Sequence, residues 1–106
     1  LFIDFTGIYC ANCRVMERTV FKTAPVKRVF DKMVLTRLYV DKKDSLSKIF
    51  SKMQFERYQQ ATQPYYVVLD PETESTIVDT GGYIPNGFNI FLEKGLKNYQ
   101  LNRISF

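Results

Sequence analysis

Two cysteines, Cys10 and Cys13, are the residues of this chain best suited to covalent chemistry. They are the only cysteines among 106 residues, so neither has a competing partner elsewhere in the chain. Their spacing permits a disulfide that closes a very small ring, and such a strained bridge opens more readily than a structural one. Thiol–disulfide exchange is therefore the first chemistry that the sequence indicates.

The two sulfurs are expected to have different roles. An apolar strand at residues 1–5 runs into a short turn, and a helical pattern begins at Cys10. Unpaired backbone N–H groups and the positive end of a helix dipole would then face the Cys10 sulfur and stabilise its thiolate. Cysteines so placed have pKa values of roughly 3.5–7.5, against about 8.5 for a free cysteine. We expect Cys10 to be the nucleophile and Cys13, one helical turn further on the inner side, to be the resolving thiol.

Other cysteine chemistry fits the sequence poorly. The chain contains no histidine, which excludes a Cys–His nucleophile pair. Zinc takes four ligands, and two thiolates fill only half of that set, so a zinc site would require a dimer that shares two pairs. We therefore predict no metal site. A second alternative stays open, in which the cysteines form a structural bridge in a non-catalytic module that docks partners.

Asp4 interrupts the otherwise apolar first strand. Its neighbours Ile3 and Phe5 point to the opposite face of the sheet. A buried carboxylate is costly unless it is hydrogen-bonded or protonated, and burial raises its pKa. Near the resolving sulfur, such a group could take up or deliver a proton during exchange. The alternative is a carboxylate at a solvent-facing end of the strand.

Pro64 opens the apolar, β-rich run Tyr65–Leu69. Proline cannot donate a hydrogen bond to a sheet ladder, so it belongs at the start of the strand. Together with Asp4 six residues before Cys10 and the Cys-x-x-Cys pair at a helix start, this proline makes the chain resemble the thioredoxin superfamily. The resemblance implies a cis Gln63–Pro64 bond that packs against the disulfide, with backbone groups of Gln63 placed to pair with a substrate strand.

The same resemblance bears on Tyr9 and Gly81. It places Gly81 beside the disulfide, where a missing side chain lets a substrate backbone approach. A tight turn that needs positive φ explains the glycine pair at 81 and 82 equally well. Tyr9 stands where thioredoxins usually have tryptophan. The substrate-binding residues implied in this way are Tyr9, Gln63, Pro64 and Gly81.

Three blocks sharpen the resemblance: Asp-Phe-Thr-Gly before the cysteines, Asn-Cys-Arg-x-Met-Glu across them and Gln-Pro-Tyr-Tyr-Val-x-Leu-Asp later. They are similar to the C-terminal thioredoxin-like domain of the DsbD family of thiol:disulfide interchange proteins, in its Bacteroidetes-type form. The similarity extends over about residues 1–95. Between the cysteines, Ala-Asn replaces the usual Gly-Pro. Because this dipeptide tunes the redox poise, no reduction potential is carried over.

This resemblance implies a protein-disulfide reductase or electron relay whose partners are protein thiols and disulfides. Its redox centre would be the Cys10–Cys13 disulfide, with no small-molecule cofactor. A membrane electron-donor domain in the same full-length chain would re-reduce the pair, on the periplasmic side of a bacterial cell envelope. The sequence begins inside a strand and without an initiator methionine, so we expect residues 1–106 to be a single domain of a longer protein.

Composition and charge set further limits. With 45% apolar residues, the chain can build a core without disulfide staples. Residues 11–60 hold 12 Lys/Arg against 5 Asp/Glu, which gives either a basic face for an acidic partner or ordinary solvated helix faces. Aromatic and basic residues do not interleave as they do in nucleic-acid-binding proteins, so we expect no nucleic acid partner. No stretch reaches the ~18 consecutive apolar residues of a membrane span, and no signal peptide is recognisable.

The fold class expected from these features is α/β. The resemblance implies a thioredoxin-like, central mixed β-sheet flanked by helices on both faces, with the N-terminal edge strand and helix of the family missing from this chain. Apolar periodicity predicts strands at residues 1–6, 34–40, 64–69 and 76–80. It predicts helices at residues 10–21 and 25–33, within 42–61, and at 87–97. The tail from residue 99 to 106 gives no prediction.

Helical spacing also predicts which side chains face the sheet. In the first helix the inward residues are Val15, Met16, Thr19 and Val20, and the outward ones are Arg14, Glu17, Arg18 and Lys22. In the helix within 42–61 the inward residues are Ile49, Phe50, Met53 and Phe55. Arg37 aligns with a lysine that thioredoxins place near the buried aspartate. It either pairs with Asp4 or extends into water.

Overall fold

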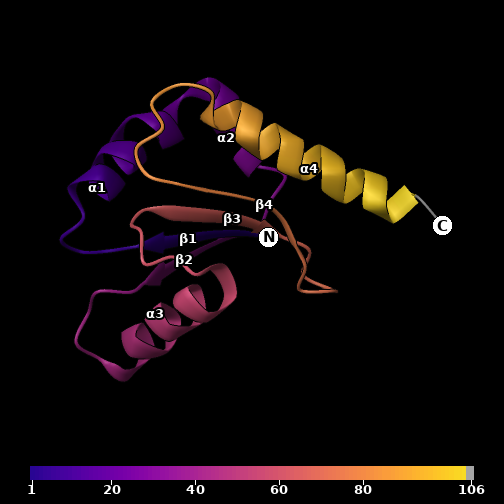
Figure 1. Cartoon of the computed structure of the whole chain (residues 1–106). Helices are drawn as coiled ribbons and strands as arrows, with labels where there is room; N and C mark the ends of the chain where they lie inside the picture. The colour runs from indigo at the N-terminus through magenta and orange to yellow at the C-terminus, as the bar shows by residue number, and fades with distance from the viewer. Residues whose placement is uncertain (105–106) are drawn as a thin grey trace.

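The computed structural model describes residues 1–104, with residues 103 and 104 described by their backbone alone. Figure 1 shows the order of the elements. They are β1 (Phe2–Thr6), α1 (Ala11–Arg18), the 3₁₀ helix η1 (Val20–Lys22), α2 (Ala24–Phe30), β2 (Leu35–Tyr39), α3 (Ser45–Tyr58), β3 (Tyr65–Leu69), β4 (Thr76–Gly81) and α4 (Phe88–Ile104).

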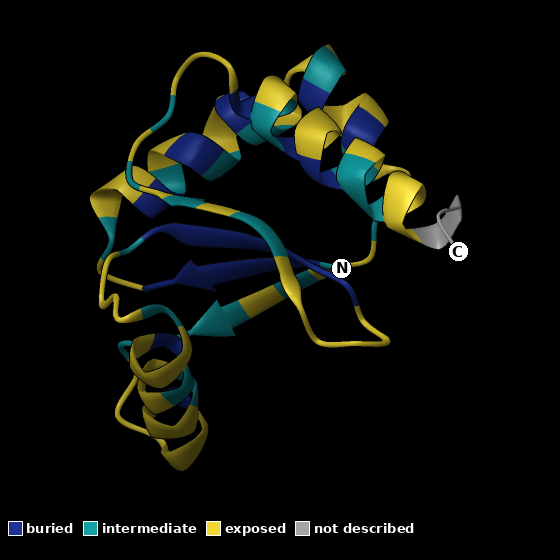
Figure 2. Cartoon of the chain, turned by 45° about the vertical axis from the view of Figure 1, so that its right-hand side comes forward, coloured by how far each residue is buried: buried dark blue, intermediate teal, exposed yellow. Residues whose placement is uncertain are grey.

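The strands form one mixed sheet in the order β2-β1-β3-β4. β1 pairs in parallel with β2 and antiparallel with β3, which pairs antiparallel with β4. Every residue of the central strands β1 and β3 is buried, whereas the outer strands mix exposed and half-buried residues (Figure 2). Burial on both faces explains why the two central strands read as nearly continuous apolar runs.

Helices cover both faces of this sheet, as predicted. α1, α2 and α4 lie on one face and α3 lies on the other (Figure 1). On the first face Phe88 of α4 packs against Tyr66 and Phe21, with ring centroids 5.0 and 5.4 Å apart. On the second face, Phe5 and the other buried residues of β1 and β3 that point toward α3 pack against Tyr58 of that helix. The predicted α/β fold class is confirmed.

The inward face of α1 differs from the prediction. Of the four residues predicted to face inward, Met16 and Val20 are buried, but Val15 and Thr19 are exposed. The buried residues of the helix itself are Cys13 and Met16. The helix also ends earlier than predicted, and η1 follows it. The inward stripe therefore begins at the second cysteine and continues through Met16 to Val20.

The buried side of α3 also differs from the prediction. Its buried residues are Ser47 and Gln54, whose side chains donate hydrogen bonds to backbone carbonyls outside the helix. The Ser47 hydroxyl donates to the Tyr39 carbonyl at 2.7 Å, and Gln54 Nε2 donates to the Thr62 carbonyl at 2.8 Å. Of the residues predicted to face inward, Phe50 and Met53 are half-buried. The other two, Ile49 and Phe55, are exposed.

The last helix, α4, continues to Ile104 and takes in most of the tail that gave no prediction; residues 105 and 106 lie outside the described part. Gly95 lets this helix approach β3, because a Cβ there would come within 2.9 Å of Val68 Cγ2. No helix among the described residues has the length and apolar character to cross a membrane.

The aromatic core predicts a large effect of Phe88→Ala. The ring is 1% exposed and contacts aromatic residues from β1, η1 and β3. Its loss should lower the free energy of unfolding by about 3–5 kcal/mol, measured by urea denaturation. Ile90→Ala is the matched control on the same helix, where the side chain is 64% exposed and the change should stay within about 1 kcal/mol. Equal effects of the two substitutions would contradict the packing described.

Candidate redox site

Cys10 and Cys13 form a disulfide at the amino-terminal end of α1, with their Cα atoms 5.2 Å apart. Cys10 is the N-cap of the helix, and its Sγ accepts a hydrogen bond from the Cys13 N–H at 3.1 Å. Donation from a helix N–H is the contact that stabilises a negatively charged sulfur. Cys10 is half-buried, whereas Cys13 is buried. The first sulfur is therefore the more accessible one, as the sequence predicts.

The residues predicted to approach the disulfide from later in the chain lie at the start of β3 and at the end of β4, which pairs with it. The Gln63–Pro64 peptide bond is cis, which confirms that prediction. The Pro64 carbonyl accepts a hydrogen bond from the Gly82 N–H at 2.8 Å, so the end of β4 lies against it. A Cβ on Gly81 would lie 3.0 Å from the Tyr65 ring. Close approach thus explains Gly81, while the positive φ of the glycine pair belongs to Gly82.

Gly7 connects these residues to the cysteines. It is buried, and its carbonyl accepts a hydrogen bond from the Cys10 N–H at 3.3 Å. A Cβ on Gly7 would overlap the side-chain oxygen of Gln63, so the Gln63 side chain lies on the loop that leads to Cys10. Tyr9, 86% exposed, stands in the same loop. The predicted substrate-binding residues therefore share one end of the sheet with the disulfide, and their contact with a substrate stays a prediction.

Asp4 is only 4% exposed in the middle of β1, so the alternative of a solvent-facing carboxylate is wrong. Its Oδ1 has no hydrogen-bond partner in the part of the chain that the structure describes, and its Oδ2 lies 3.9 Å from Nε of Arg37. Burial raises the pKa of Asp4 from 3.8 to about 7; Arg37 opposes this rise and Glu17 adds to it. A carboxyl that exchanges protons near neutral pH suits the predicted proton-transfer role, which itself stays a prediction.

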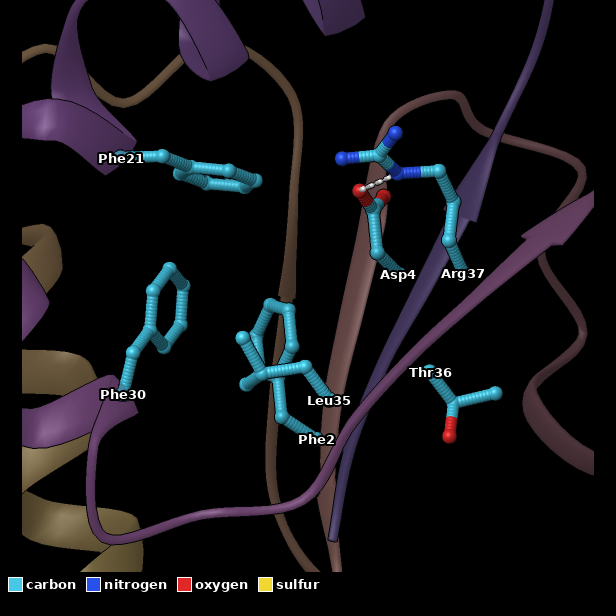
Figure 3. Close-up of a pocket in the computed structure, with 7 residues that line it drawn as sticks. All are labelled: Phe2, Asp4, Phe21, Phe30, Leu35, Thr36 and Arg37. Carbon is cyan, nitrogen blue, oxygen red and sulfur yellow. Dashed lines mark ion pairs between the residues drawn. The ribbon is translucent and has the colours of Figure 1, made fainter.

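The sequence allowed Arg37 either to pair with Asp4 or to extend into water, and the side chain does both. It faces Asp4 in the parallel register of β1 and β2, and its Nη1 lies 3.5 Å from Oε1 of Glu17. Nevertheless its side chain is 47% exposed. The Asp4–Arg37 pair lines a cavity of about 270 Å³. Figure 3 shows this ion pair among the other residues that line the cavity. The residues that line the cavity are Phe2, Asp4, Phe21, Phe30, Leu35, Thr36 and Arg37.

Arg14 and Glu17 are part of the site, although the sequence predicted that both face outward from α1. Both are half-buried on the flank of α1. Arg14 donates to Thr6 Oγ1 at 2.9 Å and to the Gly7 carbonyl at 3.1 Å, and it pairs with Glu17 at 2.8 Å. Since Glu17 also contacts Arg37, a chain of charges joins the helix to Asp4. The spacing of Arg14 and Glu17 at i, i+3 directly after the second cysteine was the available signal.

Comparison with known protein families agrees with this geometry. A family model described as thioredoxin-like matches residues 1–71. The chain belongs to the thioredoxin-like family. The matched segment contains both cysteines, Asp4 and the cis Gln63–Pro64 bond. No curated protein matches the chain. A thioredoxin-like domain with a disulfide at Cys-x-x-Cys spacing points to thiol–disulfide redox function in general.

The buried carboxyl of this thioredoxin-like domain predicts how its stability depends on pH. Because the pKa of Asp4 rises from 3.8 to about 7 on folding, the folded state binds more protons between these values. The free energy of unfolding should therefore fall as the pH rises from about 4 to about 7. A pKa difference of about three between the folded and the unfolded state corresponds to a fall in the free energy of unfolding on the order of 4 kcal/mol.

The measurement is urea denaturation of the disulfide form at pH values from about 4 to about 8. Asp4→Asn should remove most of this decline and leave the variant more stable than the wild type at neutral pH. Asp31→Asn, a change at an exposed carboxylate, should retain the wild-type profile. A wild-type stability that rises over this range would show that Asp4 is not the dominant buried acid.

Proposed function

We propose that this domain is a protein-disulfide reductase that acts as an electron relay. The observation that carries the proposal is the pairing of a half-buried, N-capping Cys10 with a buried Cys13 at the start of one helix. The hydrogen bond that Cys10 Sγ accepts from the Cys13 N–H favours the thiolate form when the disulfide is reduced. The nucleophile thus has both access and charge stabilisation, and the resolving thiol is one turn away.

The reaction proceeds by two thiolate attacks. The Cys10 thiolate attacks one sulfur of a target disulfide, which breaks the target S–S bond and forms a mixed disulfide. The other target sulfur leaves as a thiolate and takes a proton. Cys13 then loses its proton and attacks Cys10 Sγ, which releases the second target sulfur. Two electrons pass to the target, which becomes a dithiol, and the domain returns to the Cys10–Cys13 disulfide.

Asp4 is proposed as the proton acceptor and donor for the buried thiol. Cys13 cannot attack until its proton leaves, and no histidine is present in the chain to take it. Asp4 lies on the buried strand that precedes the cysteines, with a pKa raised to about 7 by its burial. Arg37 opposes this rise in pKa without cancelling it, and Oδ1 has no hydrogen-bond partner among the described residues. Asp4 can therefore hold a proton at a pH where an exposed aspartate cannot.

Replacement of each cysteine tests the assigned roles. With dithiothreitol as donor, the wild type should reduce insulin, and Cys10→Ser should abolish this activity because the attacking sulfur is gone. Cys13→Ser should instead accumulate a mixed disulfide with the target, visible by non-reducing electrophoresis and mass spectrometry. In the reduced wild type, the rate of Cys10 alkylation should titrate below a pH of about 8.

A structural bridge in a non-catalytic module would give the opposite pattern. Cys10 would then be unreactive near neutral pH, and insulin would not be reduced. The direction of electron flow needs a separate measurement, because it depends on the reduction potential. Thioredoxin-fold proteins range from about −270 to about −120 mV, and a potential above roughly −150 mV would contradict the assignment as a reductase.

The resemblance of the three sequence blocks to DsbD-type domains supports a more specific proposal. In it, the partners are protein thiols and disulfides of the bacterial periplasm, and a membrane domain of the same full-length protein re-reduces Cys10–Cys13. The redox centre is the disulfide alone, without a small-molecule cofactor. The full-length reading frame tests this placement: a hydrophobic multi-span segment upstream supports the relay, whereas a bare signal sequence points to a free-standing periplasmic protein.

A further inference from the structure

Asp41 joins the turn after β2 to the turn that leads to the disulfide. Its Oδ1 accepts a hydrogen bond from the Ile8 N–H at 2.9 Å, and its Oδ2 accepts one from the Tyr9 N–H at 3.0 Å. Each carboxylate oxygen thus takes one of two successive backbone donors. Because β1 and β2 are parallel, both turns leave the same end of the sheet, as Figure 1 shows. The residue that immediately follows this pair is Cys10.

The position of Asp41 is itself fixed from two sides. On one side, the Val40 N–H donates to the Thr6 carbonyl at 3.0 Å and extends the pairing of β1 with β2. On the other side, the buried hydroxyl of Ser47 donates to the Tyr39 carbonyl at 2.7 Å and accepts from the Lys42 N–H at 3.2 Å. Ser47 therefore ties together the backbone before and after Asp41. These two hydrogen bonds account for the burial of a serine on α3.

Gly7 shows how closely the segments meet. A Cβ there would lie 2.6 Å from Asp41 Oδ2 and would overlap Oε1 of Gln63. The Asp41 carboxylate and the Gln63 side chain thus converge on the backbone of a single residue. The loop that carries Ile8 and Tyr9 is held at its base by these contacts, while both of its side chains remain exposed.

We propose that Asp41 is a positioning residue for the docking of protein disulfides. It holds the exposed Ile8–Tyr9 segment in one orientation beside Cys10, so that a partner can contact this segment while its disulfide faces the nucleophile. A carboxylate suits this role because each of its two oxygens accepts from one N–H group and carries negative charge, whereas the amide of an asparagine offers one neutral oxygen. This role rests on the proposed protein-disulfide reductase function. It differs from thiolate activation, which depends on the Cys13 N–H and the start of α1.

The test compares Asp41→Ala and Asp41→Asn with the control Asp31→Asn. Asp31 is an exposed aspartate that directly follows α2. Three quantities are measured: amide hydrogen exchange of Ile8 and Tyr9 by NMR, kcat and KM for insulin reduction, and the rate of Cys10 alkylation by iodoacetamide. The small reagent needs no docking surface, so it separates positioning from sulfur reactivity. Circular dichroism establishes that each variant is folded, and Asp41→Asn serves if Asp41→Ala does not fold.

In Asp41→Ala the two amides should lose protection, and KM for insulin should rise about tenfold, as expected for lost charge-assisted hydrogen bonds. Both kcat and the alkylation rate should stay within about twofold of the wild type. Asp41→Asn should give an intermediate KM, and Asp31→Asn should match the wild type. An unchanged KM overturns the docking role, and so does an alkylation rate that falls in parallel with insulin reduction.

Failure of the proposed function would look different from failure of this inference. If the wild type does not reduce insulin, the reductase proposal is overturned, and the docking role falls with it. Amide exchange still decides whether Asp41 holds the loop: equal protection of Ile8 and Tyr9 in the wild type and in Asp41→Ala overturns that contact whatever the activity.

Discussion

The burial of β1 on both faces is the constraint on which the rest of the structure depends. The strand is hydrogen-bonded to β2 on one edge and to β3 on the other, and helices cover it above and below. Its carboxyl end is therefore where the chain can carry exposed reactive groups. Cys10 follows there, at the start of α1, and the starts of β3 and of the turn after β2 meet at the same end.

Much of the fold and of the site could be predicted because the residues concerned have few alternative uses. Two lone cysteines at Cys-x-x-Cys spacing allow little besides exchange chemistry, and Pro64 before an apolar run can only begin a strand. Asp4 stands out because its neighbours are all apolar, and its burial follows from the strand that contains it. Fully buried strands also give long apolar runs that are easy to recognise.

The parts that could not be predicted depend on polar groups with distant partners. Apolar periodicity assigned Ile49 and Phe55 to the interior, yet the buried places on α3 are taken by Ser47 and Gln54. Their hydrogen bonds go to carbonyls of other segments, which spacing within the helix cannot reveal. Glu17 was missed for the same reason, because its contact with Arg37 exists only once β2 lies beside β1.

The cavity beside Asp4 extends toward the end of the sheet opposite to the disulfide. Its walls include Phe2 and Leu35, at the amino-terminal ends of β1 and β2, whereas Cys10 lies beyond the opposite end of β1. Arg37, whose side chain is half exposed, also lines the cavity. In the proposed reaction, a partner docked at Cys10 would leave this cavity uncovered, so the wall that Asp4 contributes to it would stay clear of the docked chain.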